Sequence, residues 1–399
     1  MTASEPWRAA LAAAGLLAPD GSTRPTIFAE MSALAAEHDA VNLGQGFPDE
    51  DGPAEVLEAA VEAIRAGVNQ YPPGRGMPVL RAAISEHRAR FGAPQPDPET
   101  EVLVTAGATE AIAATLLALV PRGGEVVTLS PFYDAYAAII GLLGARHATI
   151  PLRAPDFQPD PADIDAAIGP RTTVVLLNNP HNPTGSVIAP ELLERIAARA
   201  AAHGAVVVSD EVYEHLVFDD APFTPIAAVP SAVGRALTIS SAAKTFRVTG
   251  WKIGWVTGPA DLIERVVAVK QFLTYVNGAP FQPAVAVGLG LPDAFFERCR
   301  STLARRRDLL SEGLREAGFA VAPSCGSYFV VADAAPLGVT DAAAFARELV
   351  RDAGVASIPL SAFAPGSPDP AIRSSLRFAF CRSDAAIEEA ARRLRGVRG

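Results

Sequence analysis

Residues 237–257, LTISSAAKTFRVTGWKIGWVT, contain two short apolar runs with two lysines between them. The runs, Leu237–Ser240 and Ile253–Thr257, are continuously apolar, as in a parallel strand that is buried on both faces. Four runs of the same kind come earlier in the chain: Val102–Thr105, Val126–Ser130, Val174–Asn178 and Val206–Asp210. Helical segments separate most of these runs, and this alternation predicts an α/β fold with a doubly wound sheet.

The pattern changes after about residue 290. A long charged helix is predicted there, and a second helix closes the chain: Ala294–Gly318 and Asp384–Arg395. Three strands are predicted between them: Tyr328–Ala332, Val355–Pro359 and Leu376–Cys381. We therefore expect a large domain over residues 46–288 and a small α+β domain over residues 289–399. Residues 1–45 are expected to pack with the small domain.

Composition argues against several classes of protein. Of the 399 residues, 49% are hydrophobic and 20% charged, which suits a large core and not a disordered chain. The net charge of −10 argues against nucleic acid or an anionic membrane as partner. No apolar run is long enough to span a bilayer, and the N-terminal stretch lacks the basic region of a signal peptide. The three scattered cysteines fit a reducing cytoplasm, and the six histidines have no metal-ligand spacing.

Only three of the 34 basic residues are lysines: Lys244, Lys252 and Lys270. Arginine stays protonated, whereas lysine can lose its proton and attack a carbonyl group. The few lysines are therefore candidates for chemistry that a guanidinium cannot perform. A bias in the base composition of the gene would also leave few lysines. The position of each lysine in the fold therefore has to show whether it has a catalytic role.

Polar and aromatic residues follow the predicted strands. Ligands of doubly wound sheets bind beyond the carboxyl ends of the strands. The first strand leads into Ala106-Gly107-Ala108-Thr109, whose small residues leave helix N-terminal N–H groups free for a phosphate. The later strands are followed by an aromatic ring, an amide, a carboxylate, a phenol, a hydroxyl and an amine: Tyr133, Asn182, Asp210, Tyr213, Ser241 and Lys244. Each alone is typical of a turn, a helix cap or a core aromatic, but together they predict a binding site.

Several of these residues belong to motifs that resemble those of class I pyridoxal-phosphate aminotransferases of fold type I. The motifs are Ser241-x-x-Lys244, Gly250-Trp251-Lys252, Asn182-Pro183-x-Gly185 and Asp210-Glu211-x-Tyr213. The resemblance covers nearly the whole chain. Within the class it looks closest to bacterial N-succinyldiaminopimelate aminotransferases, and next to the kynurenine and glutamine-type branch. It implies a large, mostly parallel doubly wound sheet domain, a smaller α+β domain and pyridoxal 5'-phosphate as cofactor.

The resemblance also assigns roles to single residues. Lys244 would bind the cofactor covalently and move a proton between the substrate Cα and the cofactor C4′, and Asp210 would keep the pyridine nitrogen protonated. The remaining contacts to the ring and the phosphate would come from Tyr133, Asn182, Tyr213, Ala108, Thr109, Ser241 and Lys252. The substrate α-carboxylate would bind to Gly46, Asn182 and Arg377.

The resemblance further implies a homodimer with shared active sites, because Tyr71 would reach the phosphate of the neighbouring subunit. The substrates would be an L-amino acid, with glutamate expected, and a 2-oxo acid. Some of these carry a second, distal carboxylate, which needs a cation other than Arg377. Arg75 is the first candidate because it follows Tyr71 closely; Arg24 and Lys270 have no motif beside them.

Two other functions remain open at this point. A carbon–sulfur β-lyase on the same fold would share every cofactor residue. A non-catalytic effector domain would be expected to follow a DNA-binding head, for which the residues before 40 leave no room. Specificity among amino donors, including methionine and kynurenine, does not follow from the sequence, because loops build that part of the pocket.

Overall fold

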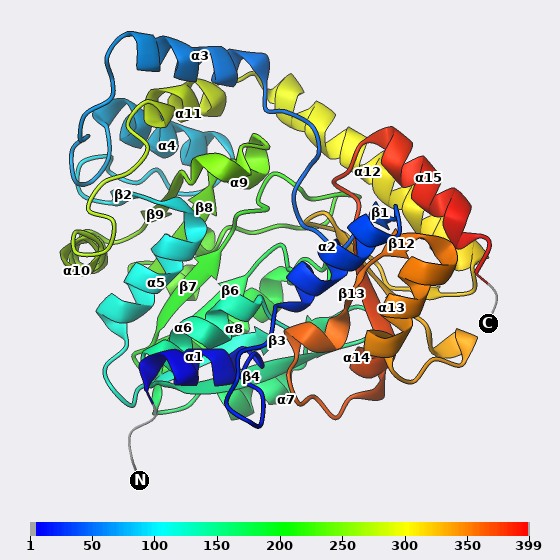
Figure 1. The fold of residues 1–399 in the computed structure, drawn as a ribbon. Helices are drawn as coiled ribbons and strands as arrows, with labels where there is room; N and C mark the ends of the chain where they lie inside the picture. Colours follow the sequence, from blue (N-terminus) through cyan, green and yellow to red (C-terminus); the bar gives the residue numbers. More distant parts are fainter. Residues whose placement is uncertain (1–4, 398–399) are drawn as a thin grey trace.

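The computed structural model describes residues 5–397, and its largest element is an eight-stranded sheet (Figure 1). Its strands lie in the order β2 (Val102–Thr105), β9 (Gly254–Thr257), β8 (Ala236–Ser241), β7 (Val206–Asp210), β6 (Thr172–Asn178), β3 (Glu125–Ser130), β4 (Arg146–Arg153) and β5 (Gln158–Pro159). All strands of this sheet point the same way except β5 and β9. The carboxyl ends of the parallel strands therefore meet at one edge.

The prediction that Ile253–Thr257 is a parallel strand is wrong, because strand β9 occupies most of these residues and is antiparallel. It lies between β2 and β8 and is antiparallel to both. The cause is the short connection from β8, which holds only helix α9 (Ala242–Thr245) and one turn of 3₁₀ helix. A parallel neighbour would need a longer crossover that returns the chain to the other end of the sheet. Strand β4 was missed because only two of its eight residues are buried and it lacks a continuous apolar run.

Helices cover both faces of the sheet. One face packs against α5 (Gly107–Leu119), α6 (Asp134–Leu142) and α10 (Ala260–Lys270). The opposite face packs against α7 (Pro161–Ala167) and α8 (Pro190–Ala202), and towards β2 against α3 (Ala54–Arg65), α4 (Pro78–Arg90) and α11 (Phe281–Leu289). Strand side chains alternate between these two cores, as a sheet buried on both sides requires. Among the helices of residues 5–397, none combines the length and the apolar character needed to cross a membrane.

A four-stranded antiparallel sheet forms the C-terminal part, in the order β10 (Ala320–Val321), β11 (Phe329–Asp333), β14 (Ser375–Ala379) and β13 (Ile358–Pro359). The helices around it are α12 (Asp293–Glu316), α13 (Ala342–Ala353), α14 (Pro370–Ser374) and α15 (Asp384–Leu394), with α12 and α15 packed side by side (Figure 1). The predicted strand Val355–Pro359 is in fact two short strands, because β12 (Val355–Ala356) pairs with β1 (Val41–Asn42) and only β13 joins this sheet.

Residues 5–45 do not pack as one piece. Helix α2 (Ile27–Glu37) and β1 lie against α13, β12 and β13 of the C-terminal part. Helix α1 (Pro6–Ala13) instead packs on α6 beside the large sheet, with Ala9 and Ala13 so close to Gly141 that a larger residue there would clash (Figure 1). The chain thus spans both parts before residue 45. The domain limit between residues 288 and 289 stays a prediction.

Candidate active site

A cavity of about 330 Å³ lies at the carboxyl ends of the parallel strands. It is lined by every residue predicted for the site except Tyr71: Gly46, Ala108, Thr109, Tyr133, Asn182, Asp210, Tyr213, Ser241, Lys244, Lys252 and Arg377. Side chains from the ends of five parallel strands and from the C-terminal sheet therefore meet in one place.

An anion can bind at one end of the cavity, where helix α5 begins. Its N-cap, Ala106, has no side chain to accept hydrogen bonds from the first turn. Gly107 adopts a left-handed conformation with φ of +77° and lies beside Lys252. The free N–H groups and positive end of α5, the Ser241 hydroxyl and the Lys252 ammonium thus surround one space.

The Lys244 amine is buried at the centre of this site. Its Nζ donates to the carbonyl oxygen of Gly46 at 3.4 Å and lies 5.7 Å from the centre of the Tyr328 ring. Burial lowers the pKa of Lys244, and the nearby cation Lys252 acts in the same direction. A lysine with a lowered pKa yields the neutral amine that nucleophilic attack and proton transfer require.

Asp210 ends strand β7 and is buried. Its carboxylate accepts hydrogen bonds from the Tyr136 hydroxyl at 2.6 Å and from the Val212 N–H at 3.4 Å. Burial raises the pKa of Asp210 to about 6. Within residues 5–397 no cation forms an ion pair with this carboxylate, and the charge of the nearby Lys244 lowers its pKa by less than burial raises it. The carboxylate is thus suited to pair with a positively charged ring nitrogen.

Two further tyrosines complete the wall around Lys244. The rings of Tyr213 and Tyr328 meet edge to face at 5.1 Å, and the Tyr328 hydroxyl donates to the Gly46 carbonyl oxygen. Burial raises the pKa of both phenols, so both stay protonated donors. Tyr136 and Tyr328 were not predicted as site residues. The spacing of Tyr136, three residues after Tyr133 on a helix, was a usable signal, whereas Tyr328 stands in no motif.

Arg377 is 2% exposed and held between two aromatic rings, 4.0 Å from the centre of Phe329 and 4.6 Å from that of Phe363. Its guanidinium donates to Asn182 Oδ1 at 3.0 Å and to the Gly44 carbonyl oxygen at 2.6 Å. Neither partner is charged, and within residues 5–397 its Nε has no partner at all. Burial lowers the pKa of Arg377 to about 10, and a bound carboxylate would supply the charge and the acceptors that this group lacks.

Tyr71 lies outside the cavity of its own chain. Its side chain is 82% exposed and its ring meets Tyr275 edge to face at 5.6 Å. Arg75 does not line the cavity of its own chain either, where its guanidinium pairs with Glu264 and donates to the Thr100 carbonyl oxygen. Arg75 is expected beside Tyr71 in the partner subunit's site, so its role towards a distal carboxylate stays a prediction.

The other two candidate cations differ from each other. Lys270 is buried and donates to the Tyr275 carbonyl oxygen at 2.6 Å, so it supports a loop. Arg24 lines a smaller cavity of about 290 Å³ that shares Phe28 and Asp134 with the active-site cavity. Of the three cations, Arg24 alone lies on a cavity next to the site.

The polar groups of the site fit pyridoxal phosphate. The uncapped start of α5 suits its phosphate, the unmatched Asp210 carboxylate suits its ring nitrogen, and the buried Lys244 amine suits its aldehyde. A resident metal has no comparable support, because no three His, Cys, Asp or Glu side chains in residues 5–397 converge on a common point.

Comparison with known proteins agrees with this geometry. The family model for class I and II aminotransferases matches residues 38–394. A Mycobacterium tuberculosis protein named as a probable N-succinyldiaminopimelate aminotransferase is 52% identical over 378 residues, which cover 92% of this chain and 95% of that protein. The methionine aminotransferase of Escherichia coli is 37% identical over 370 residues, covering 93% and 95% of the two chains.

Solved structures support the same relationship. The structure of N-succinyldiaminopimelate aminotransferase from Mycobacterium tuberculosis matches with a TM-score of 0.90 at 52% identity, over 94% of this chain and 97% of that one. The resemblance found in the sequence is thereby confirmed for the family, the fold and the cofactor. This chain belongs to the class I and II aminotransferases, enzymes of fold type I that depend on pyridoxal phosphate.

Proposed function

We propose that the enzyme is an N-succinyldiaminopimelate aminotransferase, which exchanges an amino group between glutamate and a succinylated 2-oxo acid in lysine biosynthesis. The main support for a transamination reaction is that Lys244, Asp210 and Arg377 line the same cavity. The 52% identity to the mycobacterial protein favours this substrate over that of the methionine aminotransferase, which is 37% identical.

Lys244 carries out the proton transfer in this proposal. Bound pyridoxal phosphate supplies a ring that withdraws electrons from the substrate carbon. The neutral Lys244 amine, which burial favours, takes the proton from the substrate Cα. The Gly46 carbonyl oxygen and the Tyr213 and Tyr328 rings hold the amine in a fixed place for this step.

The remaining residues bind and orient. Asp210 would keep the ring nitrogen of the bound cofactor protonated, Tyr213 and Asn182 would donate to its phenolic oxygen, and Tyr133 would hold the ring. The backbone of Ala108 and Thr109, the Ser241 hydroxyl and the Lys252 ammonium would bind its phosphate. The substrate α-carboxylate lies against Arg377, Asn182 and the Gly46 backbone, so that its Cα faces Lys244.

A substrate screen tests the proposed function. With purified enzyme and pyridoxal phosphate, we expect kcat/KM for N-succinyl-LL-2,6-diaminopimelate with 2-oxoglutarate to exceed that for methionine, phenylalanine or kynurenine by at least tenfold. The reason is that loss of even one charge-assisted contact to a distal carboxylate costs about tenfold or more. Preference for the sulfur or aromatic donors would place the enzyme in the kynurenine and glutamine-type branch. Pyruvate release from cysteine conjugates would instead indicate β-lyase activity.

We further propose a homodimer with shared active sites in the cytoplasm. Large aromatic side chains are exposed: Tyr71 is 82% exposed and its ring meets that of Tyr275, and Phe272, three residues before Tyr275, is 83% exposed. Exposed apolar side chains of this size are typical of an interface between chains. The three cysteines are free thiols, which fits a reducing compartment.

Complementation between subunits tests the sharing of sites. If Tyr71 binds the phosphate in the partner's site, Tyr71→Phe and Lys244→Ala homodimers are each impaired. Their co-expressed heterodimer then has one site with both Tyr71 and Lys244, and we expect it to recover about half of the wild-type activity per dimer. Tyr275→Phe removes a hydroxyl from the neighbouring exposed ring and serves as the matched control. A fully active monomer in sedimentation at the assay concentration would contradict the proposal.

A further inference from the structure

A short segment, residues 44–50, crosses the active site between β1 and α3. Its first end is fixed at Gly44, whose N–H donates to Asn42 Oδ1 at 3.0 Å and whose carbonyl oxygen accepts from Arg377 at 2.6 Å. Gly46 and Phe47 in the middle of the segment line the active-site cavity. The position of this segment therefore determines the shape of the active-site cavity on this side.

Gly46 has little freedom to move within the site. Its carbonyl oxygen accepts hydrogen bonds from Lys244 Nζ and from the Tyr328 hydroxyl. A Cβ on Gly46 would approach the Phe329 ring to 2.8 Å, which is closer than real contacts of this kind. A small displacement of the segment in one direction would therefore break the hydrogen bonds that Lys244 and Tyr328 donate to Gly46. A displacement in the other direction would press Gly46 against the Phe329 ring.

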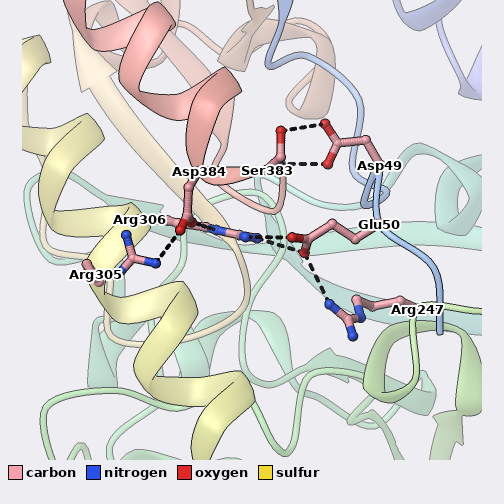
Figure 2. A network of polar contacts seen from close by, with 7 residues as sticks. All are labelled: Asp49, Glu50, Arg247, Arg305, Arg306, Ser383 and Asp384. Carbon is pink, nitrogen blue, oxygen red and sulfur yellow. Dashed lines mark hydrogen bonds and ion pairs between the residues drawn. The ribbon is translucent and has the colours of Figure 1, made fainter. Parts of the chain in front are cut away.

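The second end of the segment is held by charged groups, which Figure 2 shows. Glu50 binds Arg306 of α12 through both carboxylate oxygens, at 2.9 and 3.1 Å, and the same carboxylate accepts from Arg247 at 3.1 Å. Arg306 also binds Asp384 at the start of α15, at 2.6 Å. The adjacent Asp49 accepts from the N–H of Ser383 at 2.7 Å.

This network is less exposed than a typical surface ion pair. The Arg306 side chain is only 6% exposed, and its two parallel contacts to Glu50 fix the carboxylate in one plane. The hydrogen bonds from Arg306 lower the pKa of Glu50, so the carboxylate stays charged at neutral pH. Arg247 lies three residues after Lys244, with a left-handed φ of 58°. Glu50 therefore joins the 44–50 segment both to α12 and to the loop that carries Lys244.

We propose that Glu50 is a positioning residue of the reaction: by binding Arg306 and Arg247 it holds the 44–50 segment in the place where Gly46 contacts Lys244 and the substrate carboxylate. Glu50 acts through Gly46 and does not touch substrate itself. This inference rests on the proposed roles of Lys244, Arg377 and Gly46, and it is independent of which amino acid the enzyme prefers.

Replacing Glu50 by glutamine in the holoenzyme tests the inference. The amide keeps the shape but loses the charge and cannot accept from both arginines with both atoms. With any substrate pair that the wild-type enzyme turns over, we expect KM to rise 5- to 20-fold for both substrates and kcat to fall less than threefold. This split is expected because a displaced Gly46 weakens substrate binding before it affects the chemical step. The variant should still bind pyridoxal phosphate in full, as its visible absorption measures, because the proposed contacts to the phosphate and the ring do not include Glu50.

The matched control is Glu316→Gln. It leaves Arg395 without its carboxylate partner at the far end of the same helix α12, where both side chains are about half exposed. We expect KM within twofold of wild type. If Glu50→Gln lowers the unfolding temperature but leaves KM within twofold, the network is merely structural and the proposal is wrong. Should Glu50→Gln fail to fold, Arg247→Gln breaks only the link to the Lys244 loop, and an unchanged KM in that variant would overturn the proposal equally.

Discussion

Replacing Lys244 by alanine is expected to reduce kcat by about 10⁴-fold or more, since one group supplies both the bond to the cofactor and the proton transfer. The amine is buried, its pKa is lowered by that burial, and it donates to the Gly46 carbonyl oxygen inside the cavity. No other lysine is placed to replace it, because Lys252 lies beside Gly107 at the start of α5. Single-turnover rates with an amino acid and stoichiometric pyridoxal phosphate measure this loss.

The variant should nevertheless still bind pyridoxal phosphate. The start of α5, Ser241, Lys252 and Asp210 are unchanged, so equilibrium dialysis should show a noncovalent complex. Borohydride reduction of the wild-type enzyme should mark one peptide, the one that contains Lys244. Lys270→Met is the matched control, because Lys270 is buried but serves the Tyr275 loop; its kcat should stay within threefold of wild type. A label on Lys252 or Lys270 would contradict the assignment.

Residues next to buried strands were predictable from the sequence. A continuous apolar run locates a strand, and a parallel sheet brings the residue after each run to the same edge. Asp210 illustrates this, since it ends β7 in register with Ile239 of β8, next to the β8 end that leads into Ser241 and Lys244. The motif around it also shows the limit of such reasoning. Glu211 directly follows Asp210 but lies near Arg88, away from the cavity.

Contacts between distant segments could not be predicted in the same way. Tyr328 reaches Gly46 across 282 residues, and Arg75 binds Glu264 across 189 residues. Neither pairing leaves a periodic pattern in the sequence. The direction of β9 was missed for a related reason, because an apolar run shows burial but carries no information on the direction of a strand. Packing of α1 on the large sheet likewise depends on the close approach of Ala9 and Ala13 to Gly141.

Replacing Asp210 by asparagine is expected to separate catalysis from stability. The amide has nearly the same shape but carries no charge, so it cannot keep the ring nitrogen of the cofactor protonated. A single pKa unit corresponds to about 1.4 kcal/mol, and loss of a buried carboxylate shifts the pKa of its partner by several units. We therefore expect kcat to fall by at least 100-fold. Near wild-type kcat in this variant would disprove the role of Asp210.

The same Asp210→Asn substitution, which lowers kcat, should raise the free energy of unfolding of the cofactor-free protein. Burial raises the pKa of Asp210 from 3.8 to about 6 in the folded chain. A raised pKa means that the ionised carboxylate costs stability: the cost is absent below about pH 4, grows as the pH rises and is complete above about pH 6. The neutral amide of the variant avoids this cost, which a shift of about two units places at about 3 kcal/mol. Without cofactor, Asp210→Asn should thus have the higher free energy of unfolding at pH 8, measured with urea, and the difference should vanish near pH 4. A variant less stable than wild type at pH 8 would show that the carboxylate is matched within the protein itself and does not wait for the cofactor.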